Sequence, residues 1–134
     1  MADIYMVEDD ADYASVIVKV LGSLGHTVEV ESDPARALVR LKLKRPALLL
    51  LDVMFPENSF AGIELARILN HDPAFTDMPI LLLTAVNEKY SMGFSSQDID
   101  NSFFPVSDFL DKSVDLDVLK EKVTNMIAGK GKVI

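Results

Sequence analysis

The chain has 134 residues, which fits one domain, and 49% of them are hydrophobic, which is enough for a packed core. A net charge of −8 with only small basic clusters disfavours nucleic-acid binding, and the absence of cysteine excludes disulfides and thiolate metal sites. The N-terminus does not read as a signal peptide and the apolar run 47–51 is too short to span a bilayer, so we expect a cytoplasmic protein that has no membrane contact.

The first part of the chain predicts a strand, a helix and a second strand. Residues 4–7 are a short apolar strand that stops at an acidic run, Glu8-Asp9-Asp10. Apolar residues recur at helical spacing over 13–24, and Gly25 is a natural end for that helix. Residues 27–31 alternate polar and apolar side chains, which is typical of a strand at the edge of a sheet.

A second helix and a central strand follow. Asp33 is a suitable N-cap before a proline at the first helical position, and this helix is expected to end near Pro46. Residues 47–51 are uniformly apolar, as expected of a strand buried on both faces, and they end at Asp52. A short helix is predicted over 62–70.

The last part of the chain predicts two more strands and a helix. Residues 79–83 are again fully apolar and end at Thr84. A fifth strand lies within 103–110, before Asp111 and Lys112. The final helix begins after an N-cap at Asp115 and is closed by Gly129.

Alternating strands and helices predict an α/β protein with a doubly wound, five-stranded parallel sheet and helices on both faces. The uniformly apolar strands belong in the middle and the alternating second strand at the edge, which favours the strand order 2-1-3-4-5. Ligands of such sheets bind beyond the carboxyl ends of the strands, here in the crevice between the first and third strands.

Chemically active side chains follow four of the five strands: Glu8, Asp9, Asp52, Thr84 and Lys112. Neighbouring strands lie about 4.8 Å apart, so the acids of the first and third strands should be close together and repel each other. Carboxylates without nearby histidine or cysteine suit Mg²⁺ better than zinc, so we expect a Mg²⁺ site there. Taken singly, the acids also fit a helix N-terminus and Lys112 fits a solvated surface lysine.

The chain resembles bacterial two-component response regulators, in particular their CheY-like receiver domains, over nearly its whole length. The matching motifs are the runs 7–10, 50–56, 62–65, 79–85 and 108–112. The resemblance implies a flavodoxin-like fold, a single receiver domain over 1–134 without an output domain, and a phosphorelay role rather than an enzymatic one.

The resemblance also implies the roles of individual residues. Asp52 is expected to accept a phosphoryl group from a histidine kinase or a phosphotransfer protein, and Mg²⁺ to be bound by Glu8, Asp9, Asp52 and the backbone carbonyl of Met54. Thr84 is expected to hydrogen-bond the phosphoryl group and Lys112 to pair with it.

Phosphorylation is then expected to change the surface that binds an unidentified downstream protein. Phe109 matches the aromatic switch position of the family, although it also fits an ordinary core or edge phenylalanine. The sequence leaves the oligomeric state open, a homodimer included.

Several features depart from the family pattern. Ser113 follows Lys112 where the family has proline, often after a cis bond, which puts the placement of the lysine in doubt. The segments 56–62 and 84–112 are longer than usual, which fits either a remodelled partner surface or tolerated insertions. Met54 and Val86 cannot orient a hydrolytic water, so we predict slow autodephosphorylation.

Two other functions remain as alternatives. A Mg²⁺-dependent aspartyl phosphatase needs a second acid two residues after the nucleophile, where this chain has Met54. A pseudo-receiver that only scaffolds partners is disfavoured by the complete set of acids, threonine and lysine.

Overall fold

The computed structural model describes residues 2–52, 61–84 and 108–129. Its elements in chain order are β1 (Asp3–Val7), α1 (Ala11–Gly22), β2 (Thr27–Glu31), α2 (Pro34–Leu43), β3 (Leu48–Asp52), α3 (Ala61–Asn70), the 3₁₀ turn η1 (Pro73–Phe75), β4 (Ile80–Thr84), β5 (Asp108–Asp111) and α5 (Leu116–Ile127). The predicted elements are therefore present, with shifts of a few residues at their ends.

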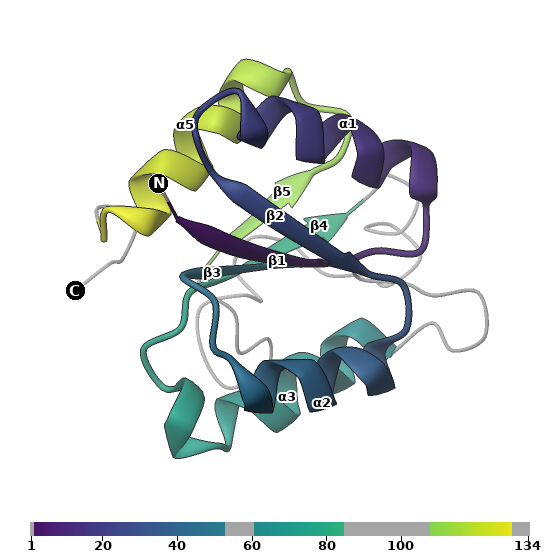
Figure 1. Cartoon of the computed structure of the whole chain (residues 1–134), viewed down its shortest axis with the longest axis vertical. Helices are drawn as coiled ribbons and strands as arrows, with labels where there is room; N and C mark the ends of the chain where they lie inside the picture. The colour runs from purple at the N-terminus through teal and green to yellow at the C-terminus, as the bar shows by residue number, and fades with distance from the viewer. Residues whose placement is uncertain (1, 53–60, 85–107, 130–134) are drawn as a thin grey trace.

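The strands form one five-stranded sheet in the order β2-β1-β3-β4-β5, and every pair of neighbours is parallel. Figure 1 shows α1 and α5 on one face of this sheet and α2 and α3 on the other. The predicted doubly wound, flavodoxin-like fold and its strand order are thus confirmed.

Side chains of the central strands alternate between two core clusters, because successive residues of a strand point to opposite faces. Along β3, Leu49 and Leu51 join the cluster under α2 and α3, whereas Leu48 and Leu50 join the cluster under α1 and α5. All four leucines are fully buried. Burial on both faces explains why this strand is uniformly apolar.

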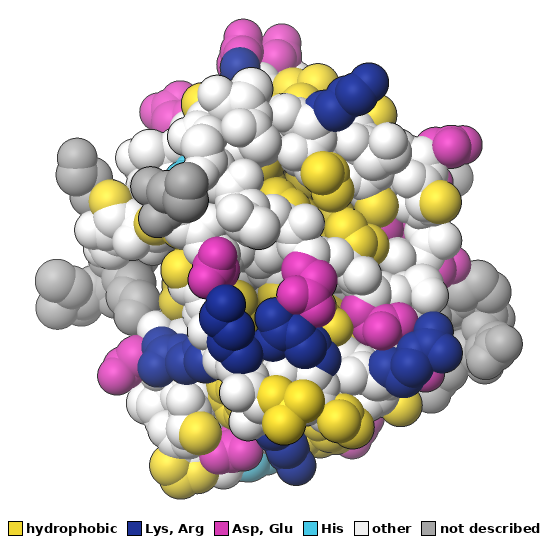
Figure 2. Space-filling model, in the orientation of Figure 1, with side chains coloured by type: hydrophobic (Ala, Val, Ile, Leu, Met, Phe, Trp, Pro, Cys, Tyr) yellow, Lys and Arg dark blue, Asp and Glu magenta, His cyan; other side chains and the backbone are white. Residues whose placement is uncertain are grey.

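The edge strand β2 is fastened to α2 by charged side chains instead. Arg40 binds Glu29 through two contacts, Nη2–Oε1 at 2.7 Å and Nε–Oε2 at 2.8 Å. One helical turn further along, Lys44 Nζ lies 3.2 Å from an oxygen of Asp3 on β1. Figure 2 shows basic and acidic side chains next to one another across the middle of this face.

Only part of the apolar pattern predicted over 13–24 is buried on α1. Its buried residues are Ala14, Ile17 and Leu21, whereas Val16 and Leu24 are 44% and 41% exposed. The helix ends at Gly22, so Leu24 lies in the turn that precedes β2 rather than on the helix.

Among the described helices, none combines the length and the apolar character that a membrane span requires.

Candidate functional site

Three of the predicted site residues converge at the carboxyl edge of the sheet. Glu8 directly follows β1, Asp52 ends β3 and Lys112 directly follows β5. Each is two residues beyond a member of the core cluster under α1 and α5, namely Met6, Leu50 and Leu110, so the strand alternation directs all three to the same face.

The acids form a compact cluster. Glu8, Asp9 and Asp52 each offer a carboxylate oxygen, and these oxygens all lie within 4.8 Å of one another. Glu8 and Asp52 are buried, with 2% and 1% of their surface exposed, whereas Asp9 is exposed. The predicted acids are therefore brought together, and one of them faces solvent.

The ammonium group of Lys112 bridges the two buried acids. Its Nζ lies 2.8 Å from Glu8 Oε1 and 3.0 Å from Asp52 Oδ1. Burial opposes the charge of Lys112, but its hydrogen bond to Glu8 and the negative charges of Asp52 and Glu8 outweigh burial and raise the pKa of Lys112 above its usual value. The lysine is therefore a permanent cation at this site.

Each of the three acids in the run 8–10 makes different contacts. Besides binding Lys112, Glu8 accepts a hydrogen bond through Oε2 from the backbone N–H of Asp10, at 3.1 Å. Asp9 turns its side chain to the exposed part of the cluster. Asp10 is the N-cap of α1, and its Oδ1 accepts from the N–H groups of Asp12 and Tyr13. A single run of acids therefore both builds the cluster and starts the helix beside it.

Ser113 stands where the family has proline, and Lys112 before it contacts Asp52. The Lys112–Ser113 peptide bond is trans. The N–H and the hydroxyl of Ser113 both donate to Asp111 Oδ1, at 2.9 and 2.8 Å, and Val114 N–H donates to the Asp111 carbonyl at 3.1 Å. Local hydrogen bonds thus order the turn that carries Lys112.

Tyr13 is a site neighbour that the sequence indicates only as the first residue of the apolar pattern over 13–24. The Lys112 Nζ lies 5.0 Å from the centroid of its ring. Burial raises the pKa of Tyr13 to about 12; Lys112 opposes this shift, and the nearby carboxylates of Glu8, Asp52 and Asp111 reinforce it. The available signal was its position, three residues after a capping aspartate and hence in the first turn beside the cluster.

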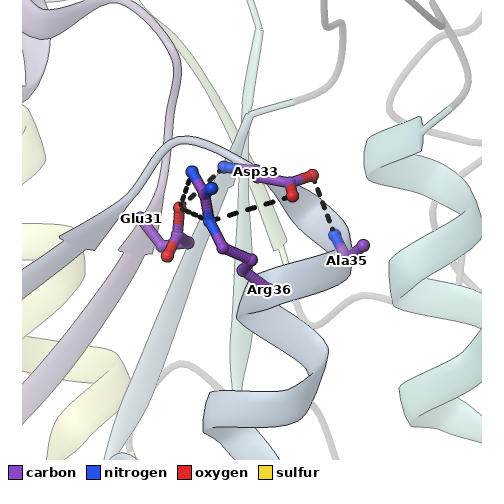
Figure 3. Close-up of polar contacts among 4 residues, drawn as sticks. All are labelled: Glu31, Asp33, Ala35 and Arg36. Atoms are coloured by element: carbon purple, nitrogen blue, oxygen red, sulfur yellow. Dashed lines mark hydrogen bonds and ion pairs between the residues drawn. The ribbon is translucent and has the colours of Figure 1, made fainter.

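Other acids near this edge are neutralised separately. The carboxylate of Glu31 accepts from Arg36 Nε at 3.2 Å and from the backbone N–H of Asp33 at 3.0 Å. Asp33 in turn caps α2 through the N–H of Ala35, as Figure 3 shows. Arg36 therefore forms ion pairs with Glu31 and Asp33. Lys112 forms ion pairs with the other two acids, Glu8 and Asp52.

The remaining predicted residues lie partly outside the description. Thr84 ends β4 in register with Asp111, and its side chain is outside the described residues. Met54, Val86 and most of the two long segments are also outside them. Phe109 is half-buried and packs against the cluster under α2 and α3, on the face opposite Lys112.

A doubly wound parallel sheet with clustered acids and a lysine at its carboxyl edge defines a class of α/β proteins whose chemistry lies at the switch between β1 and β3. The family model described as the response regulator receiver domain matches residues 4–124, so the chain belongs to this family. The resemblance inferred from its motifs is thereby confirmed.

Individual relatives agree with this assignment. The chain is 38% identical to the DNA-binding response regulator MtrA of Mycobacterium tuberculosis over 82 residues, which cover 61% of the chain and 34% of MtrA. It is 36% identical to the phosphate regulon regulatory protein PhoB of Pseudomonas aeruginosa over 86 residues, or 64% of the chain and 37% of PhoB. The matched part thus spans about a third of these relatives.

Solved structures show the same fold. A putative response regulator from Chloroflexus aurantiacus superposes with a TM-score of 0.79 at 27% identity, covering 95% of this chain and 98% of that one. The receiver domain of the histidine kinase PA1611 from Pseudomonas aeruginosa, described with a magnesium ion in its active-site cleft, gives 0.78 at 23% identity, covering 95% and 98%.

Proposed function

We propose that Asp52 accepts a phosphoryl group from a phosphohistidine of a sensor histidine kinase or a phosphotransfer protein, and that Mg²⁺ assists this transfer. The observation that carries the proposal is the contact of Lys112 with Asp52, at 3.0 Å, inside a cluster of three carboxylates. In a member of the receiver family, this contact supports phosphoryl transfer to the aspartate, because the ammonium can offset charge on the phosphoryl oxygens.

The chemistry is a single displacement at phosphorus. A carboxylate oxygen of Asp52 attacks the phosphorus, and the bond between phosphorus and the imidazole nitrogen breaks. The imidazole keeps the electron pair of that bond and takes up a proton, which leaves an acyl phosphate on Asp52. Lys112 offsets the negative charge of the equatorial oxygens, and such charge stabilisation is the main contribution that a protein makes to this reaction.

The donor set fits Mg²⁺. Three carboxylates and one ammonium leave a formal charge of −2, which a divalent cation balances. Mg²⁺ prefers carboxylate oxygens and keeps several waters, so the exposed Asp9 leaves room for them. Glu8, Asp9, Asp52 and the carbonyl of Met54 would hold the ion. When bound, it would supply positive charge to the phosphoryl oxygens.

Signalling follows from a shift between two conformers. Thr84 would hydrogen-bond the phosphoryl group, and Phe109 would then change its packing against the cluster under α2 and α3. A half-buried phenylalanine suits this role because it already contacts the core without being sealed in it. The altered surface would bind a downstream protein, and a homodimer is one candidate arrangement.

The chain itself is proposed to act as one cytoplasmic receiver unit over 1–134 and as a phosphoacceptor rather than an enzyme, with slow autodephosphorylation. Its net charge of −8 disfavours direct contact with nucleic acid, although some relatives are named as DNA-binding. A scaffold that is never phosphorylated is the alternative, and the phosphatase is disfavoured by Met54.

Acetyl phosphate with Mg²⁺ provides the test. Intact mass spectrometry should show one added phosphoryl group on the wild-type protein and none on Asp52→Asn. The matched control is Asp117→Asn, which changes an 84% exposed carboxylate in the first turn of α5 and should label as the wild type does. Equal labelling of Asp52→Asn and the wild type would refute the assignment.

A further inference from the structure

The ammonium group of Lys112 has a third neighbour besides its two carboxylates. The aromatic ring of Tyr13 faces it, with 5.0 Å between Nζ and the ring centroid. A cation within about 6 Å of a ring centroid is attracted to the electron-rich face. The lysine side chain is only 17% exposed, so this contact is largely removed from water.

Tyr13 is itself held in place through both its backbone and its ring. Its backbone N–H donates to Asp10 Oδ1 at 3.1 Å, in the first turn of α1. Its ring packs against the core cluster under α1 and α5. Glu8, which binds Lys112, also accepts from the N–H of Asp10, so the cap, the tyrosine, the lysine and the acid form one closed set of contacts.

A lysine needs such support more than an arginine does. Its four-carbon stem is flexible, and fixing it has a large cost in rotamer entropy. Its two ion pairs with carboxylates restrain the ammonium only through the acids. The ring of Tyr13 adds a contact that involves no carboxylate, so it would remain when an incoming phosphoryl group takes over one of the carboxylate contacts.

We propose that Tyr13 is a positioning residue that keeps the ammonium of Lys112 beside Asp52 for phosphoryl transfer. This inference rests on the proposed function of Asp52 and extends it to α1. This positioning role requires the aromatic ring of Tyr13, which contacts the ammonium, and does not require the phenol hydroxyl.

Two substitutions separate the ring from the rest of the side chain. Tyr13→Phe keeps the ring and should be phosphorylated by acetyl phosphate within about twofold of the wild-type rate. Tyr13→Leu keeps an apolar side chain for the core but loses the ring, and its rate should fall by about threefold to tenfold, which is the range that a partly desolvated cation–ring contact supports. Equal rates for Tyr13→Leu and the wild type, or an equally slow Tyr13→Phe, would overturn the proposal.

Tyr5 provides a matched control. Its ring lies 5.2 Å from the guanidinium carbon of Arg40, at the β2 side of the sheet and away from the carboxylate cluster. Tyr5→Leu therefore removes a ring–cation contact of similar geometry without touching Lys112. We expect the phosphorylation rate of Tyr5→Leu to match that of the wild type at temperatures well below its unfolding transition, and an equal slowing in Tyr5→Leu would assign the effect to general loss of core packing.

A double-mutant cycle tests whether Tyr13 acts through Lys112. In a Lys112→Met background, Tyr13→Leu should cause no further loss of rate. The same fold-loss in both backgrounds would mean that Tyr13 merely supports the fold, and would overturn the proposal.

A spectroscopic readout separates failure of this inference from failure of the proposed function. The Lys112 side-chain resonances should be shifted upfield by the ring in the wild type and in Tyr13→Phe, and should move to ordinary values in Tyr13→Leu. Unshifted wild-type resonances contradict the pairing itself. A wild type that takes up no phosphoryl group contradicts the proposed function, and with it any role of Tyr13 in transfer.

Discussion

Replacing Lys112 by methionine should expose how strongly the site depends on one cation. The substitution keeps an apolar stem of similar length and removes an ammonium that lies 2.8 and 3.0 Å from two buried carboxylates. At an effective dielectric of about 20, each contact at this range is an attraction of roughly 5.5 kcal/mol, largely offset by the cost of taking the ammonium out of water. Breaking buried pairs by removing one partner typically costs about 3–5 kcal/mol.

We therefore expect Lys112→Met to lower the free energy of unfolding by about 3–5 kcal/mol near neutral pH in the absence of divalent ions. Adding Mg²⁺ should reduce the deficit, because a divalent cation replaces the lost charge.

The assay is urea unfolding followed by far-ultraviolet circular dichroism in EDTA, since the chain has no tryptophan. The control is Lys120→Met, which removes a 36% exposed lysine from its contact with Asp117 and should change stability by less than about 0.5 kcal/mol. A deficit for Lys112→Met that equals the control, or that Mg²⁺ leaves unchanged, would refute the view that Lys112 compensates the buried acids.

Three further predictions concern the fold and its titration. Leu50→Ala in the buried centre of β3 should cost about 2–5 kcal/mol in urea unfolding, whereas Leu43→Ala at an 80% exposed position should cost less than about 0.5 kcal/mol; equal losses would contradict the two-sided burial of the sheet. Asp33→Ala should cost about 1 kcal/mol through loss of the α2 cap, and an unchanged midpoint would argue against that hydrogen bond. Burial raises the pKa of both Tyr5 and Tyr13 to about 12, so the stability that these phenols contribute is complete below about pH 10 and is lost as the pH rises toward 12. Alkaline titration by phenolate absorbance should show two of the three tyrosines ionising late, and ionisation of all three near pH 10 would contradict the burial of Tyr5 and Tyr13.

The order of the sheet could be predicted because burial leaves a clear mark on strands. β3 is apolar at four successive positions, whereas polar and apolar residues alternate in β2. The central place of β3 and the edge place of β2 therefore follow from the pattern of apolar residues alone. The orientation of α1 could not be predicted in the same way. Val16 and Val18 make that helix apolar on more than one side, and only its packing on the sheet selects the face of Ala14, Ile17 and Leu21.

The candidate site was predictable where it depends on strand ends and not where it depends on the start of a helix. Parallel strands place Glu8, Asp52 and Lys112 at one edge of the sheet, and this placement does not depend on the conformation of the loops. The contact of Tyr13 with Lys112 depends on where α1 begins and on how the turn after β5 is held. Asp10 and the Asp111–Ser113 hydrogen bonds fix these two features, and residue types alone do not show that together they bring the ring to the ammonium.

Chemical mapping of the phosphorylated residue tests the central claim most directly. Borohydride reduces an aspartyl phosphate to homoserine with release of phosphate, so treatment after labelling with acetyl phosphate and Mg²⁺ marks the acceptor permanently. Peptide sequencing by mass spectrometry should find homoserine at position 52 in the wild type and at no position in Asp52→Asn. Homoserine at another aspartate, with Asp52 unchanged, would contradict the account.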